Sequence, residues 1–270
     1  MSAESRTTQA VVLARGLGRR MRAADIAPLD GAQRAAADAG VKAMIPFEGG
    51  RPFLDYVLHS LADAGTTRVG LVLGPEHEAV REYYRTQRRR RLDVSFILQP
   101  EARGTADAVA CAEEWTRGEP FLVLNADNLY PREALSRLVQ GTPPAVPGFE
   151  RDSLRLPLEK IGEYALLERD TRGCLASIVE KPGVERMRQA GARALISLNI
   201  WRFDVRIFAF CREVPVSARG ELELPQAVGL AASSGHCIEV FPVHGEVVDL
   251  SRRADVAGVA ARLAGMRVDL

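Results

Sequence analysis

A glycine-rich turn with several arginines follows the first apolar segment of the chain. It covers residues 13–21 (LARGLGRRM), directly after the apolar run 9–14. Glycines let backbone N–H groups approach phosphate oxygens closely, because no Cβ intervenes. A dinucleotide-binding turn would need a glycine where Met21 stands, and a P-loop would need Gly-Lys-Ser/Thr. The turn therefore predicts a phosphate-binding loop in which the guanidinium fork of Arg20 neutralises a triphosphate.

This turn resembles the G-x-G-T-R-M signature of the sugar-1-phosphate nucleotidyltransferases, and further landmarks of that family follow in the expected order. They are a K-x-x-x-P segment (42–46), a Q…GTA segment (99–106), a strand-end aspartate (125–127), an E-K-P motif (180–182), an asparagine-bearing strand (199) and a late aspartate segment (248–250). The resemblance spans residues 9 to 256. It implies a GT-A-like, Rossmann-related α/β fold, with a mostly parallel central sheet flanked by helices and a smaller mixed sugar-binding region.

The resemblance also implies a reaction, in which a sugar-phosphate oxygen attacks the α-phosphorus of a nucleoside triphosphate and pyrophosphate leaves. Two anions must meet, so the site needs fixed cations and a divalent ion, normally Mg²⁺. Asp127 and Asp249 would be the Mg²⁺ ligands, since this ion prefers oxygen donors. The catalytic cations would be Arg20, Lys42 and Lys181. The implied binding residues are Leu13, Ala14, Gly16, Gly18, Arg19, Gln99, Gly104 and Thr105 for the nucleotide, and Glu180 and Asn199 for the sugar.

Some of these residues also have a purely structural interpretation. Asp249 could end a strand ahead of a helix cap at Ser251. Gln99 could be a polar strand end, and Gly104-Thr105 could be the start of a helix. The alternatives for the whole protein are a catalytically weak module that senses nucleotide sugars, and transfer to a non-sugar (cyclitol or alcohol) phosphate.

Lysine is scarce in this chain. Among 36 basic residues, only Lys42, Lys160 and Lys181 are lysines. A compact ammonium and a guanidinium fork are not interchangeable at a tight phosphate site. Two of the three lysines occupy motif positions, which favours a functional role for Lys42 and Lys181.

The sequence departs from the family pattern at a few positions. Arg15 and Arg19 stand where the family usually has Ala and Thr or Ser, and these cations either tighten phosphate binding or point outward to acidic neighbours. Tyr164-Ala165 replaces a Tyr-Gly pair that approaches the sugar. The insertion 23–40 could form a short helical flap over the site or a contact in a homo-oligomer.

Apolar periodicity in the first half predicts strands that alternate with helices. The strands are 9–14, 68–73, 94–98 and 121–125, and the helices are 52–64, 76–90 and 105–115. This alternation predicts a largely parallel sheet covered on both faces. Ligands of such sheets bind beyond the carboxyl ends of the strands.

The second half is less regular and predicts a mixed region within one domain, 1–270, divided into a nucleotide half (9–140) and a sugar-phosphate half (141–256). The strands are 164–168, 174–181, 194–203 and 237–243, with a hairpin turn at 170–173, and the helices are 205–211, 222–232 and 253–264. The Pro/Gly stretch 141–148 is expected to be an excursion from the fold.

Composition limits the class of protein. With 36 basic and 35 acidic residues, the chain lacks the basic excess of a nucleic-acid binder. Cys111, Cys174, Cys211 and Cys237 are widely spaced without a CxxC pair, which predicts reduced thiols in a reducing compartment. A polar N-terminal segment and the lack of an apolar run of about 20 residues predict a cytoplasmic protein that does not bind membranes.

Overall fold

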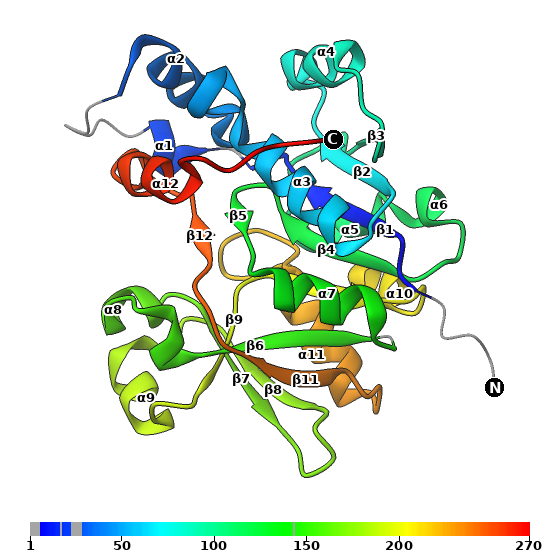
Figure 1. Cartoon of the computed structure of the whole chain (residues 1–270). Coiled ribbons are helices and arrows are strands. Elements are labelled where there is room, and N and C mark those ends of the chain that lie inside the picture. Colours follow the sequence, from blue (N-terminus) through cyan, green and yellow to red (C-terminus); the bar gives the residue numbers. More distant parts are fainter. Residues whose placement is uncertain (1–5, 17, 23–28, 143) are drawn as a thin grey trace.

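Parallel strands from the first half of the chain form one side of the central sheet in the computed structural model (Figure 1), in the order β3-β2-β1-β4. They are β1 (Gln9–Leu13), β2 (Arg68–Leu73), β3 (Asp93–Leu98) and β4 (Phe121–Asn125). The strands predicted for this half are thus confirmed with nearly the same bounds. Because the strands are parallel, their carboxyl ends meet at one edge of the sheet.

The structure describes residues 6–16, 18–22, 29–142 and 144–270, apart from the side chains of Arg19 and Arg20. Within these ranges the central sheet has ten strands.

The second half of the chain continues the same sheet with mixed pairing, as predicted. β10 pairs antiparallel with β4, and the order continues β10-β6-β9-β7-β8, with β11 parallel to β6. The bounds of these strands are β6 (Ala145–Glu150), β7 (Ala165–Arg169), β8 (Leu175–Val179), β9 (Leu195–Ser197), β10 (Ile200–Phe203) and β11 (Glu239–Val243).

The expectation that 141–148 leaves the fold is wrong, because β6 lies inside the sheet. On the edge of β6 that faces β10 and β9, Ala145 pairs with β10 and Phe149 pairs with β9. Pro147 lies between these two paired residues, so its missing N–H interrupts neither pairing. Gly148 passes so close to β9 that an added Cβ would lie 2.8 Å from the Cβ of Leu195. Local composition predicted a loop here, but the sheet tolerates Pro147 and the close approach of β9 requires Gly148.

Helices cover both faces of the sheet. α3 (Phe53–Ala64) and α7 (Arg132–Gln140) pack together on one face, and α5 (Thr105–Ala110), α10 (Ile207–Glu213) and α11 (Leu224–Ser233) lie on the other (Figure 1). Successive residues of β1 point to opposite faces: Ala10 and Val12 belong to the core beneath α3, whereas Val11 belongs to the core beneath α5. The predicted double coverage is confirmed.

The remaining helices used below are shorter or peripheral. They are α4 (Glu78–Thr86), α6 (Glu113–Thr116), α8 (Leu158–Ile161), α9 (Gly183–Ala190) and α12 (Asp255–Leu263). The helix predicted over 105–115 is therefore divided into α5 and α6, and α7, α8 and α9 were not predicted. Throughout the described ranges, no helix combines the length and the apolar character that crossing a membrane requires.

The insertion contains the helix α2 (Gly31–Ala39), while residues 23–28 lie outside the described ranges. Asp30 and Gln33 form a reciprocal capping box at its start. Arg253, just before α12, donates to the Met21 carbonyl at 2.7 Å and pairs with Asp38 at 2.5 Å. These contacts hold α2 against the C-terminal region, and the predicted role of the insertion as a flap or an oligomer contact stays a prediction.

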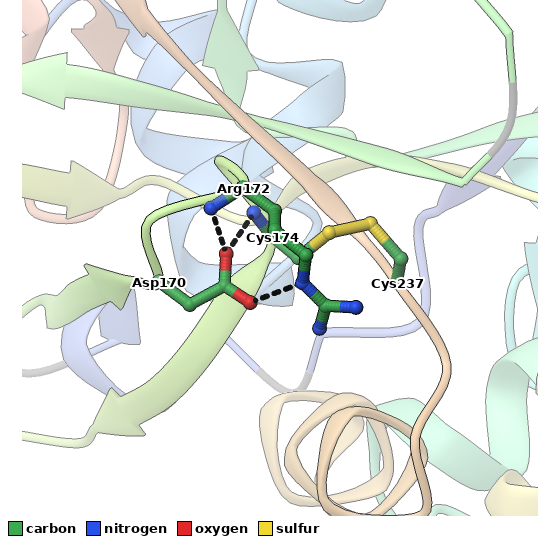
Figure 2. The surroundings of a disulfide bond; sticks show 4 residues. All are labelled: Asp170, Arg172, Cys174 and Cys237. Carbon is green, nitrogen blue, oxygen red and sulfur yellow. Dashed lines mark hydrogen bonds and ion pairs between the residues drawn. A yellow bond between two sulfur atoms is a disulfide. The ribbon is translucent and has the colours of Figure 1, made fainter.

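Two of the cysteines are joined, so the prediction of four reduced thiols is wrong. A disulfide links Cys174, at the end of the turn between β7 and β8, to Cys237, just before β11, with 5.2 Å between their Cα atoms (Figure 2). Asp170 orders this turn by accepting hydrogen bonds from the backbone N–H groups of Arg172 and Cys174, both at 2.9 Å. Linear spacing gave no sign of the pair, because the β7–β8 hairpin and β11 meet only in the folded sheet. Cys111 and Cys211 are free.

The disulfide closes a loop with a sequence separation of 63 residues, so its loss should lower stability. The Cys174→Ser variant should lose about 2–4 kcal/mol of unfolding free energy, because the unfolded chain gains entropy when the loop opens. For a chain of this size, this corresponds to a Tm lower by roughly 5–10 °C. Calorimetry under non-reducing conditions checks this, with Cys111→Ser as the matched control, since Cys111 is free. Equal Tm values for the two variants would contradict the prediction.

Candidate active site

The phosphate loop leaves β1 at the carboxyl edge of the sheet, next to the end of β4. The Ala126 N–H donates to the Leu13 carbonyl and the Ala14 N–H donates to the Val72 carbonyl, both at 3.1 Å. Leu13 and Ala14 are therefore held between their neighbouring strands, as the sequence predicts for the start of such a loop. The side chains of Arg19 and Arg20 lie outside the described part of the structure, so the role predicted for each stays a prediction.

The two glycines of the loop meet different neighbours. Gly18 has a φ of 59°, and an added Cβ would lie 2.2 Å from the Gly40 carbonyl oxygen, so no other residue fits there. Gly16 is exposed, and its added Cβ would lie 3.6 Å from Cε of Lys42. The loop and Lys42 therefore lie next to each other.

Asp127 and Asp249 are brought together by a small second sheet. β5 (Asn128–Leu129) pairs antiparallel with β12 (Val248–Asp249), which places Asp249 opposite Asn128. The Leu250 N–H also donates to the Asp127 carbonyl at 2.9 Å. Burial raises the pKa of the Asp249 carboxyl, the Ser251 hydroxyl lowers it, and the negative charge of Asp127 raises it again. The sequence could not show this pairing, but it did name both residues.

Each of these carboxylates is paired with a lysine. Lys42, in the short 3₁₀ helix η1 (Lys42–Met44), forms an ion pair with Asp127. Lys160 Nζ, at the end of α8, lies 3.7 Å from Asp249 Oδ2 and 3.9 Å from Asp255 Oδ1. Sequence reasoning assigned no role to Lys160. The scarcity of lysine was the signal that could have singled it out.

Two hydroxyl groups hold the Asp249 carboxylate. Ser251 Oγ donates to Oδ1 at 2.6 Å, and the Tyr164 hydroxyl donates to Oδ2 at 3.2 Å. Burial and the charge of Asp249 raise the pKa of Tyr164 far above its ordinary value, so this hydroxyl remains a donor. The alternative of a helix cap at Ser251 is not found, because Asp255 accepts the Ser251 N–H and α12 begins later.

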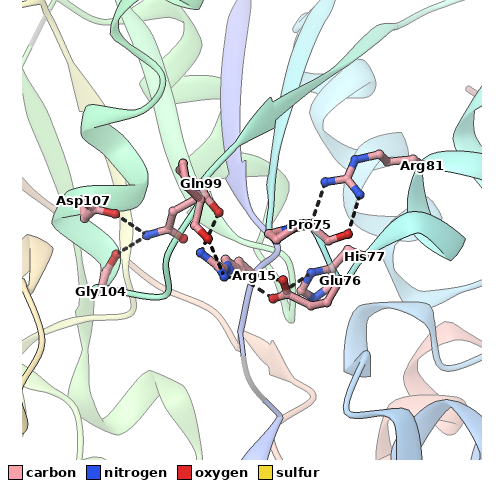
Figure 3. Close-up of polar contacts among 10 residues, drawn as sticks. Arg15, Pro75, Glu76, His77, Arg81, Gln99, Gly104 and Asp107 are labelled. Atoms are coloured by element: carbon pink, nitrogen blue, oxygen red, sulfur yellow. Dashed lines mark hydrogen bonds and ion pairs between the residues drawn. The ribbon is translucent and has the colours of Figure 1, made fainter.

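The predicted base-binding residues form a second group, at the end of β3 (Figure 3). The Gln99 side-chain Nε2 donates to the Gly104 carbonyl at 3.1 Å and to Asp107 at 2.8 Å. Gly104 has a φ of 122°, and an added Cβ would lie 2.4 Å from the Leu222 carbonyl oxygen. The Thr105 hydroxyl accepts the Leu224 N–H at 2.9 Å and so caps α11. The alternative that Gly104-Thr105 starts a helix is also found, because α5 begins at Thr105.

The predicted sugar-binding residues adopt unusual backbone conformations. Lys181 has a φ of 44° and Asn199 a φ of 59°, values that non-glycine residues rarely adopt and that concentrate at functional sites. Lys181 Nζ lies 3.9 Å from Glu163. Burial raises the pKa of Glu180, and the nearby charge of Glu223 raises it further. The Tyr130 hydroxyl donates to the Leu198 carbonyl at 2.7 Å and the Asn199 carbonyl at 3.3 Å, which ties the Asn199 turn to the chain that follows Asp127.

These contacts form a continuous rim around the carboxyl edge of the sheet. The rim runs from Gln99 and Gly104 across Leu222–Leu224 to Glu180 and Lys181, then through Glu163 and Tyr164 to Asp249, Asp127, Lys42 and Gly16. Leu13, Ala14 and Asn199 lie outside this chain of contacts, since they bond to Ala126, Val72 and Tyr130. Residues from both halves of the chain contribute to the rim.

A glycine-rich loop and two carboxylates thus lie at the carboxyl edge of the parallel strands, where open α/β sheets bind their ligands. Residues 34–244 match the sequence profile of the nucleotidyl transferase family. Because that match covers more than half of the chain, the protein belongs to the nucleotidyl transferase family, whose members are enzymes that transfer nucleotidyl groups. The family resemblance of its motifs is confirmed.

Individual relatives are distant. The UTP–glucose-1-phosphate uridylyltransferase AglF of Haloferax volcanii is 25% identical over 250 residues, which cover 92% of this chain and 93% of AglF. The low-salt glycan biosynthesis nucleotidyltransferase Agl11 of the same organism is 23% identical over 223 residues, which cover 80% of this chain. The chain spans only 58% of the length of Agl11.

A solved structure shares the fold. The crystal structure of a UDP-glucose pyrophosphorylase complexed with UDP-glucose superposes with a TM-score of 0.75 at 16% identity, covering 97% of this chain and 100% of that chain. The predicted nucleotidyltransferase fold is thereby confirmed.

Proposed function

We propose that this enzyme joins a nucleoside triphosphate to a sugar 1-phosphate and releases pyrophosphate. The observation that carries the proposal is the pairing of β5 with β12, which sets Asp127 beside Asp249 next to the phosphate loop and Lys42. The relative AglF is a UTP–glucose-1-phosphate uridylyltransferase, which supports a sugar 1-phosphate as the acceptor.

The donor set at Asp127 and Asp249 fits Mg²⁺. Two carboxylates close enough for one to raise the pKa of the other offer hard oxygen ligands to a divalent ion. Among the described residues, no group of three or more His, Cys, Asp or Glu side chains could hold a metal ion alone, so substrate oxygens and water would complete the shell. When bound, Mg²⁺ would neutralise phosphate charge and orient the α-phosphate.

The cations of the site would bind and orient the two anionic substrates. Lys42, beside Gly16 and Asp127, would contact the phosphates that lie on the loop, and Arg20 would hold the pyrophosphate that leaves. Lys181, across the rim, would bind the sugar phosphate, with Glu180 and Asn199 beside the sugar hydroxyls. Gln99, Gly104 and Thr105 would face the base, and Thr105 would do so through its backbone, because its hydroxyl already accepts the Leu224 N–H.

The organisation of the protein follows from the same proposal. Residues 1–270 would act as one domain, since both halves contribute strands to one sheet and residues to one rim. A nucleoside triphosphate and a sugar 1-phosphate would be the partners, without nucleic acid or membrane, and the insertion is the first surface to test for a homo-oligomer. A cytoplasmic location stays a prediction, and the Cys174–Cys237 disulfide weighs against it. Thiol trapping in intact cells would test it.

A substrate matrix tests the proposed function. Five nucleoside triphosphates, each combined with about a dozen sugar 1-phosphates and Mg²⁺, are assayed for pyrophosphate release, beginning with UTP and glucose 1-phosphate. We expect release only when triphosphate, sugar phosphate and metal are all present. Failure of every pair to release pyrophosphate would contradict the proposal. A cyclitol phosphate is tested in the same way. If it were the only acceptor that gave pyrophosphate release, the acceptor would not be a sugar phosphate.

Lys160 should contribute to turnover, although no motif singles it out. Its ammonium lies between Asp249 and Asp255, so its loss leaves two neighbouring carboxylates without a fixed counter-charge. We expect Lys160→Met to lower kcat/KM about tenfold or more. Lys160→Arg, which keeps the charge, should retain most of the activity, and full activity in Lys160→Met would contradict the assignment.

A further inference from the structure

Arg15 occupies the phosphate loop, but its guanidinium group points to the base-binding region. Nη1 donates to the Gln99 carbonyl at 2.6 Å and Nη2 to the Pro100 carbonyl at 3.3 Å, while Nε lies 3.1 Å from Glu76 Oε1 (Figure 3). Only 10% of the Arg15 side chain is exposed. Both expectations for this extra cation are therefore incomplete: it does meet an acidic neighbour, but it also joins two loops of the site.

The segment that receives Arg15 is built around it. An added Cβ on Gly74 would lie 2.3 Å from Nε of Arg15 and equally close to the Glu76 carboxylate, so a side chain there would displace the pair. Arg81 fixes the same segment by donating to the carbonyls of Gly74 at 2.7 Å and Pro75 at 3.4 Å. Arg81 therefore fixes the backbone that immediately precedes Glu76.

Gln99 is fixed from two directions. Arg15 holds its backbone carbonyl, and the Gln99 N–H donates to the Leu73 carbonyl at 3.0 Å. Both hydrogens of its side-chain amide are directed to protein acceptors, the Gly104 carbonyl and Asp107. Within the described residues, the amide oxygen of Gln99 receives no hydrogen bond. Gln99 is 2% exposed, and this oxygen is its one polar atom without a partner among the described residues.

We propose that Arg15 is a positioning residue that couples the phosphate loop to the base loop, so that the Gln99 amide oxygen is presented to an N–H donor of the nucleobase at a fixed distance from the triphosphate. This inference rests on the proposed function and deepens it. Charge-assisted bonds from one planar guanidinium to two carbonyls and a carboxylate restrict both loops at once. Lysine, with a single point charge on a flexible stem, cannot make all of these contacts together.

The coupling predicts a specific pattern of binding loss. Arg15→Met keeps an unbranched apolar stem but removes every donor, so nucleoside triphosphate should bind about tenfold more weakly. Inorganic tripolyphosphate, which has phosphates but no base, should bind as it does to the original protein. In turnover, KM for the triphosphate should rise about tenfold, while kcat should change less than about threefold. The ratio of kcat/KM between the best and the other nucleoside triphosphates should decrease.

Isothermal titration with nucleoside triphosphate and with tripolyphosphate tests the inference without depending on turnover. Equal weakening of both ligands in Arg15→Met would overturn it, because Arg15 would then be a direct phosphate ligand. Unchanged binding of both ligands would overturn it as well.

Two further variants serve as controls. Arg15→Lys should restore less than half of the lost binding free energy, and Arg85→Ala, which removes an exposed arginine from α4, should change neither titration. If Arg15→Met fails to fold, Glu76→Gln should show the same selective loss at smaller size, and an equal loss for both ligands would overturn the inference. Lack of triphosphate binding by the original protein would instead contradict the proposed function.

Discussion

The Asp127→Asn variant should lose Mg²⁺-dependent turnover by about 10³-fold or more while remaining folded. The amide keeps the shape of the carboxylate but removes the charge that a divalent ion needs as a ligand. The change also removes the partner of Lys42 and the negative charge that acts on Asp249. Pyrophosphate release at saturating substrate, with thermal unfolding as the check on folding, provides the measurement.

A matched control separates catalysis from general loss of acidic charge. Asp93→Asn removes an exposed carboxylate at the amino end of β3, at the opposite edge of the sheet from the site, and should keep full activity. Near-normal turnover in Asp127→Asn would contradict the role of Asp127. Equal losses in the two variants would point to a change in stability.

The Lys181→Ala variant should lower kcat/KM for the sugar phosphate by about 10²-fold or more while triphosphate binding changes little. The assignment of Lys181 to the sugar phosphate comes from the E-K-P motif, and its Nζ lies 3.9 Å from Glu163, the residue before Tyr164, which bonds to Asp249. Because φ at Lys181 is positive, the protein maintains a disfavoured conformation at this residue, which is expected where the direction of a side chain matters.

Separate KM values for the two substrates check this prediction. Lys181→Arg keeps the charge but has a different shape, so it should recover only part of the activity. Arg188→Ala removes an exposed cation from α9 and should have no effect. Equal damage to the use of both substrates in Lys181→Ala would contradict the assignment to the sugar phosphate.

The parallel half of the sheet could be predicted from the sequence because its signals are local. β1, β2, β3 and β4 are short apolar runs bounded by turns, and their ends coincide with the predicted ones almost residue by residue. The candidate site residues were named instead from motifs that resemble those of the family, and their roles stay predictions. Asp127 lies two residues after β4 and the glycine-rich loop follows β1, so both stand at strand ends that the local pattern could locate.

The features that could not be predicted depend on contacts between distant segments. β6 contains Pro147 and Gly148, which locally favour a loop, but Pro147 is tolerated between two paired positions and Gly148 is needed where β9 approaches the strand. The disulfide joins Cys174 to Cys237 only because the β7–β8 hairpin reaches β11. Lys160 contacts Asp249, and β12 pairs with β5, although these segments lie far apart in the sequence. Periodicity along the chain indicates neither contact.

Arg15 illustrates the same limit at a functional position. The sequence left two directions open for this cation, toward phosphate or outward to an acidic neighbour, and the fold directs it both to Glu76 and to the carbonyls of Gln99 and Pro100. The direction of the Arg15 side chain depends on Glu76, which follows β2 and not β1, so the local sequence around Arg15 could not indicate it.

Mn²⁺ binding, followed by electron paramagnetic resonance in the presence of a non-cleavable nucleoside triphosphate analogue, tests the carboxylate pair most directly. The original protein should bind one Mn²⁺ more tightly with the analogue than without it. Asp127→Asn and Asp249→Asn should each weaken that binding by at least about tenfold, because each removes one charged ligand of the same ion. Unchanged Mn²⁺ affinity in both variants would mean that the two carboxylates do not hold the metal, and the proposed chemistry would have to be abandoned.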